Sequence, residues 1–288
     1  MTEKISHKML TTGALAISMG LVAGAAQATY STDCSGGGSG NPNCFTWTFN
    51  KTGTYFDSYG NVVNSSLLTS ESSTGGGGGI SAVATAVSNT SGTNTALQSA
   101  YIGAYGMMGV TNKDTNDQNE LKSPEHAIDN NGNVDSILFT FSGGPVNLTS
   151  FNAAYVNTDS DYTVLAYTGS GAPTLAGLSY SQLLSNGWSL IGNYNGTSST
   201  GAHNFANSTF SSYWLIGAGN SFLGATDAGN DYFKILSLAG CDCKSNPTAP
   251  GCGGGGGGGV PEPGTLLLMG AGLIGLTRIN RRRQVVAA

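Results

Sequence analysis

Alternating apolar and polar residues recur through the middle of the chain, and this pattern predicts β-strands. In the run CFTWTF every second residue is aromatic and the residues between are threonine, which is the period of a half-buried strand. The run VDSILFTF repeats the pattern. The alternating positions are Phe45, Trp47 and Phe49 in the first run and Ile137, Phe139 and Phe141 in the second.

Three further runs, DYTVLAYT, YWLIGA and DYFKILSLAG, are rich in β-branched and aromatic residues and are bounded by Gly, Asn or Asp. ISAVATAVS and SAYIGAYGMMGV are weaker strand candidates because Ala and Gly have low strand propensity. Many short strands separated by turn residues are typical of a sandwich. We therefore expect an all-β fold, a single antiparallel β-sandwich of jelly-roll type, over residues 44–241.

One short helix is predicted within GLSYSQLLSNGW. Ser179 is placed to cap it, and Gln182 follows three residues later, which is the spacing of a capping box. Leu183 and Leu184 are expected to face inward, and Gly187 to end the helix.

Glycine-rich spacers at 36–40, 75–79 and 253–259 divide the chain. They predict a flexible segment at 29–43, a Cys/Gly-rich linker at 242–259 and a separate tail at 260–288.

The first 28 residues have the pattern of a secretory signal peptide. Lys4 and Lys8 precede a mostly apolar run at 9–23, and Ala26 and Ala28 form an A-x-A cleavage site. Cleavage after Ala28 is expected to begin the mature chain at Thr29.

Between residues 29 and 259 the chain has five lysines, no arginine and fourteen acidic residues, a net charge of −9. Such a surface repels phosphate backbones, so nucleic-acid binding is not expected. The abundant Ser, Thr, Asn and Gly, with recurring aromatic residues, suit an extracellular β-protein.

Five cysteines remain after export, at positions 34, 44, 241, 243 and 252. Disulfides are expected in an oxidising compartment, and the odd number leaves one cysteine over. Spacing does not determine the pairing. We favour Cys44 with Cys241 because they flank the first and last predicted strands. A metal site formed by Cys241, Asp242, Cys243 and Cys252 is the weaker alternative, because no histidine is nearby.

The tail contains an uncharged stretch at 264–277 that is shorter than the roughly 20 residues of a comfortable membrane span. A basic group of Arg278, Arg281, Arg282 and Arg283 follows and predicts a cytoplasmic end.

Pro261, Glu262 and Pro263 precede the apolar stretch, and the combination resembles the bacterial PEP-CTERM sorting signal. This resemblance implies processing by an exosortase, transient anchoring by the tail and final delivery to the cell surface or beyond. An ordinary tail anchor is the alternative.

The domain also resembles a family of exosortase-dependent surface proteins. The similar residues are GVTN at 109–112, HAIDNNGNVDSILFTF at 126–141 and the runs DSDYTVLAYTG, YWLIGAGN and GNDYFKILSLAGC. The family implies no established activity.

Catalytic chemistry is not expected, because no H-E-x-x-H, G-x-S-x-G or P-loop motif occurs. His126 beside Glu125 and Asp129 could form an acid/base pair, but a histidine bonded within a turn at a strand entry is the favoured interpretation. A hydrolase using two facing carboxylates remains a remote alternative.

A structural calcium site is better supported by the sequence than a catalytic site, and no other cofactor is expected. Asp129, Asn131, Asn133 and Asp135 place oxygen-bearing side chains at every second position, although the run is not an EF-hand. The runs 157–161 and 226–231 are equally ambiguous between turns and calcium ligands, so no single set is favoured.

The resemblance to the sorting signal implies a structural or adhesive role in exopolysaccharide or biofilm, and a carbohydrate-binding module is the alternative. Tyr101, Tyr105, Trp188 and Tyr194 are candidates for stacking on sugar rings, although core or edge packing is the more common role of such residues.

Overall fold

The structure is a computed structural model that describes residues 43–51, 61–62, 68–72, 79–90, 93–104, 107–113, 126–226 and 229–252. The signal peptide with Ala26 and Ala28, the residue Cys34, and the sorting tail with its predicted membrane segment at 264–277 lie outside these residues. Among the described residues, no helix has the length and hydropathy needed to cross a membrane.

Strands dominate the described residues, and the helices are short. The strands are β1 (Cys44–Lys51), β2 (Asn61–Val62), β3 (Leu68–Ser72), β4 (Ser81–Ser88), β5 (Gln98–Ser99), β6 (Tyr101–Ala104), β7 (Met108–Thr111), β8 (Ile128–Asp129), β9 (Asp135–Ser142), β10 (Val146–Val156), β11 (Tyr162–Tyr167), β12 (Trp188–Tyr194), β13 (Gly201–Asn204), β14 (Tyr213–Ala218) and β15 (Tyr232–Asp242). The helices are α1 (Tyr180–Leu183) and the 3-10 helix η3 (Ser221–Leu223).

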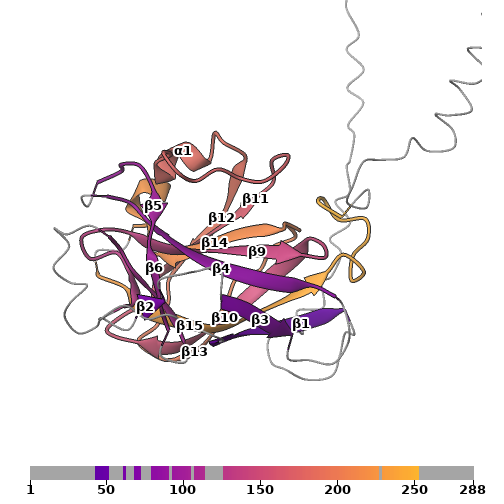
Figure 1. Ribbon diagram of the computed structural model, residues 1–288, viewed down its shortest axis with the longest axis horizontal. Helices are drawn as coiled ribbons and strands as arrows, with labels where there is room; N and C mark the ends of the chain where they lie inside the picture. Colours follow the sequence, from indigo (N-terminus) through magenta and orange to yellow (C-terminus); the bar gives the residue numbers. More distant parts are fainter. Residues whose placement is uncertain are drawn as a thin grey trace, which may run out of the picture. The chain divides into compact units, whose positions relative to one another are not determined.

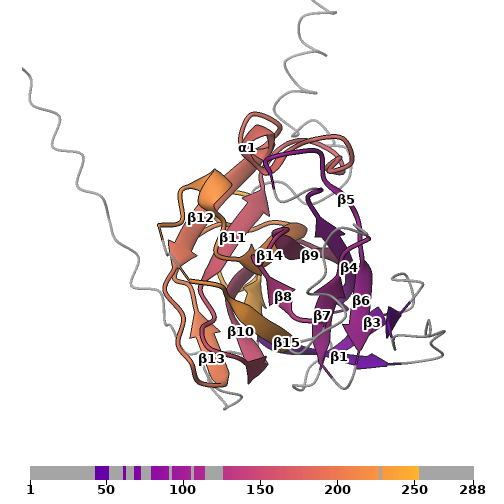
Figure 2. The same ribbon diagram turned by 90° about the vertical axis from the view of Figure 1, so that its left-hand side faces the viewer.

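Two antiparallel sheets face each other and confirm the predicted all-β sandwich (Figure 1). The upper sheet has the order β12-β11-β14-β9-β4, and the lower sheet has the order β3-β1-β15-β10-β13. At one edge the sheets are joined where Thr69 of β3 pairs with Val83 of β4. Figure 2 shows both sheets curving around a shared interior.

The strand pairing is nested along the chain. Among β1 and β9 to β15, the first strand pairs with the last, β9 with β14, β10 with β13, and β11 with β12. This is the strand order of a jelly roll. β3 and β4 each add one strand to a sheet, and β7, β6 and β2 follow β15 in that order as a small extension.

The aromatic faces predicted from the sequence form the core between the sheets. Phe45, Trp47 and Phe49 are all buried. The Trp47 ring meets Phe141 of the opposite sheet edge-on, with centroids 5.0 Å apart. Because side chains alternate across a strand, the intervening threonines of β1 face away from this core.

Strand β4 confirms the weaker strand prediction for ISAVATAVS. Ala82, Ala84 and Ala86 are buried on its inner face, directly opposite Phe141, Phe139 and Ile137 of β9. Small residues beside large ones let the sheets pack without voids.

A second hydrophobic cluster covers the outer face of the upper sheet. Helix α1 contributes Tyr180 and Leu183, which pack with Leu165 and Leu215 of the sheet. The hydroxyl of Tyr180 contacts the Ser136 hydroxyl at 2.8 Å and donates to the carbonyl of Val134 at 2.9 Å.

The capping box of α1 is confirmed, because the backbone N–H of Ser179 donates to Gln182 Oε1 at 2.8 Å. The inward orientation predicted for Leu184 is wrong, since this side chain is 46 % exposed. α1 is a single turn whose buried residues, Tyr180 and Leu183, are three positions apart. The position after Leu183 therefore faces solvent.

The two ends of the sandwich chain are fastened by disulfides. Cys44 and Cys241 are bonded, as favoured from the sequence, and they are direct partners in the β1–β15 register. Cys243 and Cys252 form a second disulfide.

The folded domain continues beyond Cys241, where the sequence predicted a linker. β15 extends through Asp242, whose N–H donates to the carbonyl of Asn43 at 2.8 Å. The loop closed by Cys243 and Cys252 includes Ala249, which is buried. The described domain therefore reaches Cys252.

Candidate functional site

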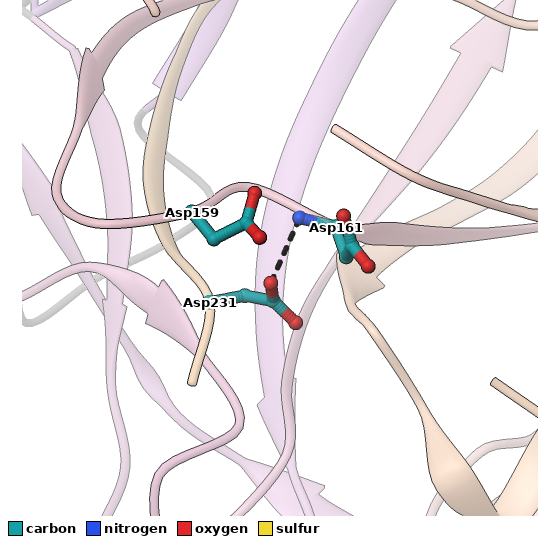
Figure 3. Close-up of side chains that lie close together, drawn as sticks. All are labelled: Asp159, Asp161 and Asp231. Carbon is teal, nitrogen blue, oxygen red and sulfur yellow. Dashed lines mark hydrogen bonds between the residues drawn. The ribbon is translucent and has the colours of Figure 1, made fainter. Parts of the chain in front are cut away.

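Three aspartates meet at the end of the sandwich opposite the Cys44–Cys241 disulfide, because Asp231 immediately precedes the eleven-residue strand β15 that ends at Asp242. Asp159 and Asp161 come from the turn before β11, and Asp231 from the loop before β15 (Figure 3). One oxygen from each carboxylate lies within 4.8 Å of the others. We call these three residues the carboxylate cluster.

Backbone pairing between the two runs builds this cluster. The N–H of Asn157 donates to the carbonyl of Tyr232 at 2.9 Å, and the N–H of Tyr232 donates to the carbonyl of Asp159 at 3.0 Å. The runs 157–161 and 226–231, which the sequence left ambiguous, are thereby brought together.

Asp231 is completely buried and accepts several hydrogen bonds. Its Oδ1 accepts from the N–H of Asp161 at 2.8 Å. Its Oδ2 accepts from the N–H of Gly219 at 3.1 Å and from Asn130 Nδ2 at 2.7 Å. In return, the N–H of Asp231 donates to Asn130 Oδ1 at 2.9 Å. Donors arranged around a carboxylate favour its charged form.

The other two members extend these bonds to neighbouring loops. Asp161 Oδ1 accepts from the N–H of Gly196 at 2.6 Å, in the connection between β12 and β13. Asp159 Oδ1 accepts from the N–H of Ser160 at 2.7 Å. The cluster therefore joins the loops that follow β8, β10, β12 and β14.

The cluster has two chemical capacities. Carboxylate and carbonyl oxygens are the ligands that Ca²⁺ prefers, and three carboxylates supply part of the six to eight that it takes. The same carboxylates act as acceptors for backbone N–H groups and hold loops in place.

The residues of the predicted run 129–135 do not join this group through their own carboxylates. Asp129 lies in β8 opposite Tyr232 and accepts from the N–H of Asn131 at 3.0 Å. Asp135 begins β9 and is fully buried. The residue of this run that reaches the cluster is Asn130, which the sequence analysis did not single out.

The two described histidines are both buried and hydrogen-bonded. His126 Nδ1 lies 2.6 Å from the Thr111 hydroxyl, at the entry to β8, which fits the favoured interpretation of a bonded histidine. Glu125, the partner in the acid/base alternative, lies outside the described residues.

Ser160 connects His203 to the carboxylate cluster, because its hydroxyl contacts His203 and its N–H donates to Asp159. His203 Nε2 is 2.8 Å from the Ser160 hydroxyl, and its Nδ1 is 3.1 Å from the carbonyl of Gly201, to which it can only donate. Its ring stacks on Phe151 at 4.8 Å. Burial lowers the pKa of His203 from its usual value, and the hydrogen bond to Gly201 opposes this shift. The sequence contains no signal for the contact between His203 and Ser160.

The candidate sugar-stacking residues are mostly packed within the protein. Trp188 is buried in the second hydrophobic cluster, 5.5 Å from Tyr167. Tyr194 stacks on Tyr162 at 5.0 Å. Lys113 lies over the ring of Tyr101 at 4.6 Å, and Tyr105 lies outside the described residues. The packing interpretation therefore holds for Trp188 and Tyr194.

The alternative metal site at the C-terminal cysteines is wrong. Cys241 is bonded to Cys44, and Cys243 to Cys252, so none of the three provides a thiolate ligand.

Comparison with known proteins identifies the tail. Residues 259–283 match the family model of the PEP-CTERM protein-sorting motif. The match includes Pro261, Glu262 and Pro263 and the four arginines predicted as the basic anchor. Searches of curated proteins and of solved structures give no match.

The chain therefore carries the sorting motif of secreted surface proteins that an exosortase processes. The motif implies processing by an exosortase and a membrane-anchored stage on the way to the cell surface.

Proposed function

We propose that the β-sandwich acts as a structural or adhesive module within an extracellular polysaccharide matrix and does not catalyse a reaction. The observation that carries this proposal is the PEP-CTERM motif at residues 259–283, because it directs the domain to the surface where such a matrix lies.

The construction of the domain supports a role outside the cell. Two disulfides close it, which suits an oxidising compartment. The described chain enters at Asn43 and leaves at Cys252, and the Asn43–Asp242 hydrogen bond places the entry beside the Cys44–Cys241 disulfide. The carboxylate cluster lies at the other end of the sandwich.

Calcium enters this proposal as a structural ion at the carboxylate cluster. Two of the three carboxylates are buried, and bringing like charges together is costly unless donors or a cation compensate them. In this role, the ion would stabilise the loops after β10 and β14 and take no part in a reaction.

The proposal is tested by binding to the exopolysaccharide of the producing bacterium. Exported and oxidised protein is co-sedimented with the purified polymer, first with calcium and then with a chelator. Saturable binding in calcium supports the adhesive role, and weaker binding in chelator supports the structural ion. Absence of binding in both buffers would remove the adhesive role.

The alternative function is a carbohydrate-binding module with one defined site. In such a module, binding depends strongly on single residues. Binding that is lost on changing one or two side chains favours a defined site. Binding that declines gradually with many changes favours a matrix role.

A further inference from the structure

The two outer faces of the sandwich differ in what covers them. On the upper sheet, the second hydrophobic cluster and helix α1 lie over the outer face. No corresponding cluster occurs on the outer face of the lower sheet among the described residues, and Figure 1 shows no described helix or strand below it.

The register of the lower sheet aligns small side chains in a row across four strands. Thr48 of β1 pairs with Ser237 of β15, Ser237 with Asn152 of β10, and Asn152 with Ala202 of β13. Their neighbours along each strand, such as Trp47, Leu238, Phe151 and His203, are buried in the interior. Because side chains alternate, the row lies on the outer face.

A second row lies beside the first. Thr46 pairs with Ala239, Ala239 with Ser150 of β10, and Ser150 with Asn204 of β13. Ser150 is buried, Ala202 and Asn204 are exposed, and the other members of the two rows are half-buried. We call this surface the polar face: Thr46, Thr48, Asn152, Ala202, Asn204, Ser237 and Ala239.

The polar face has no charged side chain, although the surrounding chain is acidic. The charged positions that the register places beside it lie at its margins. Glu71 of β3 pairs with Thr48 at one side, and Lys234 pairs with Tyr155 at the end nearer the carboxylate cluster. The ammonium of Lys234 lies over the ring of Tyr155 at 5.4 Å.

This chemistry fits a hydroxyl-rich, uncharged polymer. Hydroxyl and amide groups both donate and accept hydrogen bonds, as sugar hydroxyls do. Contact with a neutral chain requires no ion to lose its hydration, which is the costly step in burying charge. Neighbouring strands lie about 4.8 Å apart, so the face offers these groups at regular intervals. An anionic polymer would meet the repulsion of the acidic domain.

We propose that the polar face binds a neutral polysaccharide chain. This inference rests on the proposed adhesive function and names the surface and the class of polymer that the function uses. Each contact is weak, so binding depends on many contacts along one chain and is expected to increase with polymer length.

Two variants place a charged side chain at the centre of the polar face. Ser237→Lys and Asn152→Lys introduce a long cation where the row is small and neutral. Thr140→Lys is the matched control, because Thr140 is also a half-buried hydroxyl residue on an inner strand, but it belongs to β9 on the outer face of the upper sheet. Thermal unfolding of all four proteins identifies any variant that fails to fold.

Binding is measured by affinity electrophoresis of the exported full chain in gels containing dextran, hydroxyethyl cellulose or alginate. We expect retardation by at least one neutral polymer and none by alginate. Ser237→Lys and Asn152→Lys should lower the affinity for the neutral polymer about tenfold or more. Thr140→Lys should leave this affinity unchanged.

The outcomes separate the inference from the proposed function. If the neutral polymers retard the unaltered protein and all three variants equally, the polar face is not the binding surface. The proposed adhesive function would then still stand. Retardation by alginate alone would overturn the choice of a neutral polymer. If neither neutral polymer retards the protein and the exopolysaccharide of the producing bacterium does not bind it, both proposals fail.

Discussion

Gly109 in β7 packs directly against the carbonyl group of His126, so that a Cβ atom on Gly109 would overlap the carbonyl oxygen. The next residue, Val110, donates its N–H to the carbonyl of Ala127 at 3.3 Å. His126 itself has a positive φ of 58°, which is rare for a residue other than glycine. The runs that begin GVTN and HAIDN are therefore in contact in the folded protein.

Gly109→Ala is expected to destabilise the domain by about 3 kcal/mol, because the added methyl group forces the backbone of His126 to move within a packed interior. Urea unfolding of the oxidised protein measures this loss. Gly171→Ala is the control, since nothing lies near its Cβ position and only its φ of 73° is unfavourable. It should cost about 1 kcal/mol, and equal losses in the two variants would contradict the close approach at Gly109.

The two disulfides should contribute unequally to stability. The Cys44–Cys241 bond spans 197 positions and the Cys243–Cys252 bond spans 9. A longer closed loop removes more entropy from the unfolded chain. Replacing the first pair by alanine should cost about 5 kcal/mol and replacing the second about 3 kcal/mol, as measured by urea unfolding. A larger loss from the second pair would show that the 243–252 loop contributes more than its length predicts.

Much of the fold could be predicted because its signals are local. The alternation of aromatic residues and threonines identifies β1, and the capping box identifies α1. Strand β4 was less certain because its alanines gain their stability from Phe139 and Phe141 on another strand. The 243–252 loop was assigned to a linker because glycine composition carries no information about a disulfide or about the burial of Ala249.

The carboxylate cluster was only partly predictable. The runs 157–161 and 226–231 have the composition of turns and of calcium ligands alike, and their meeting depends on pairing between residues 70 positions apart. Asn130 was missed because its role depends on Asp231, which is 101 positions away. Contacts of this kind leave no periodic pattern in a single sequence.

Asp231→Asn should destabilise the protein by about 3 kcal/mol in the absence of calcium. Asp231 is buried, and its two oxygens accept from Asp161, Gly219 and Asn130. An amide in its place turns an NH₂ group toward one of these donors. Asp159→Asn is the comparison, because Asp159 is only half-buried, and it should cost about 1 kcal/mol or less. The free energy of unfolding in chelator measures both, and similar small losses would contradict the central position of Asp231.

Calcium should raise the midpoint of thermal unfolding, because an ion bound only by the folded state stabilises it by mass action. Magnesium at the same concentration should raise it less, since Mg²⁺ requires shorter and more regular coordination. Asp159→Asn should reduce the calcium effect while changing the stability in chelator little. An unfolding midpoint that is identical in calcium and chelator would show that the cluster serves only to hold its loops.

The buried imidazole of His203 should make the domain lose stability as the pH falls. Because burial lowers the pKa of His203 in the folded state, the unfolded chain binds a proton more readily. Stability is therefore complete above the unfolded value of about 6.5 and decreases as the pH falls from there through the lower pKa of the folded protein. Urea midpoints at pH 7.5 and at lower pH measure this loss. His203→Gln keeps a polar side chain of similar length but cannot titrate, so its midpoint should fall less over the same range. Equal decreases in the two proteins would assign the acid sensitivity to the carboxylates, because these titrate in both.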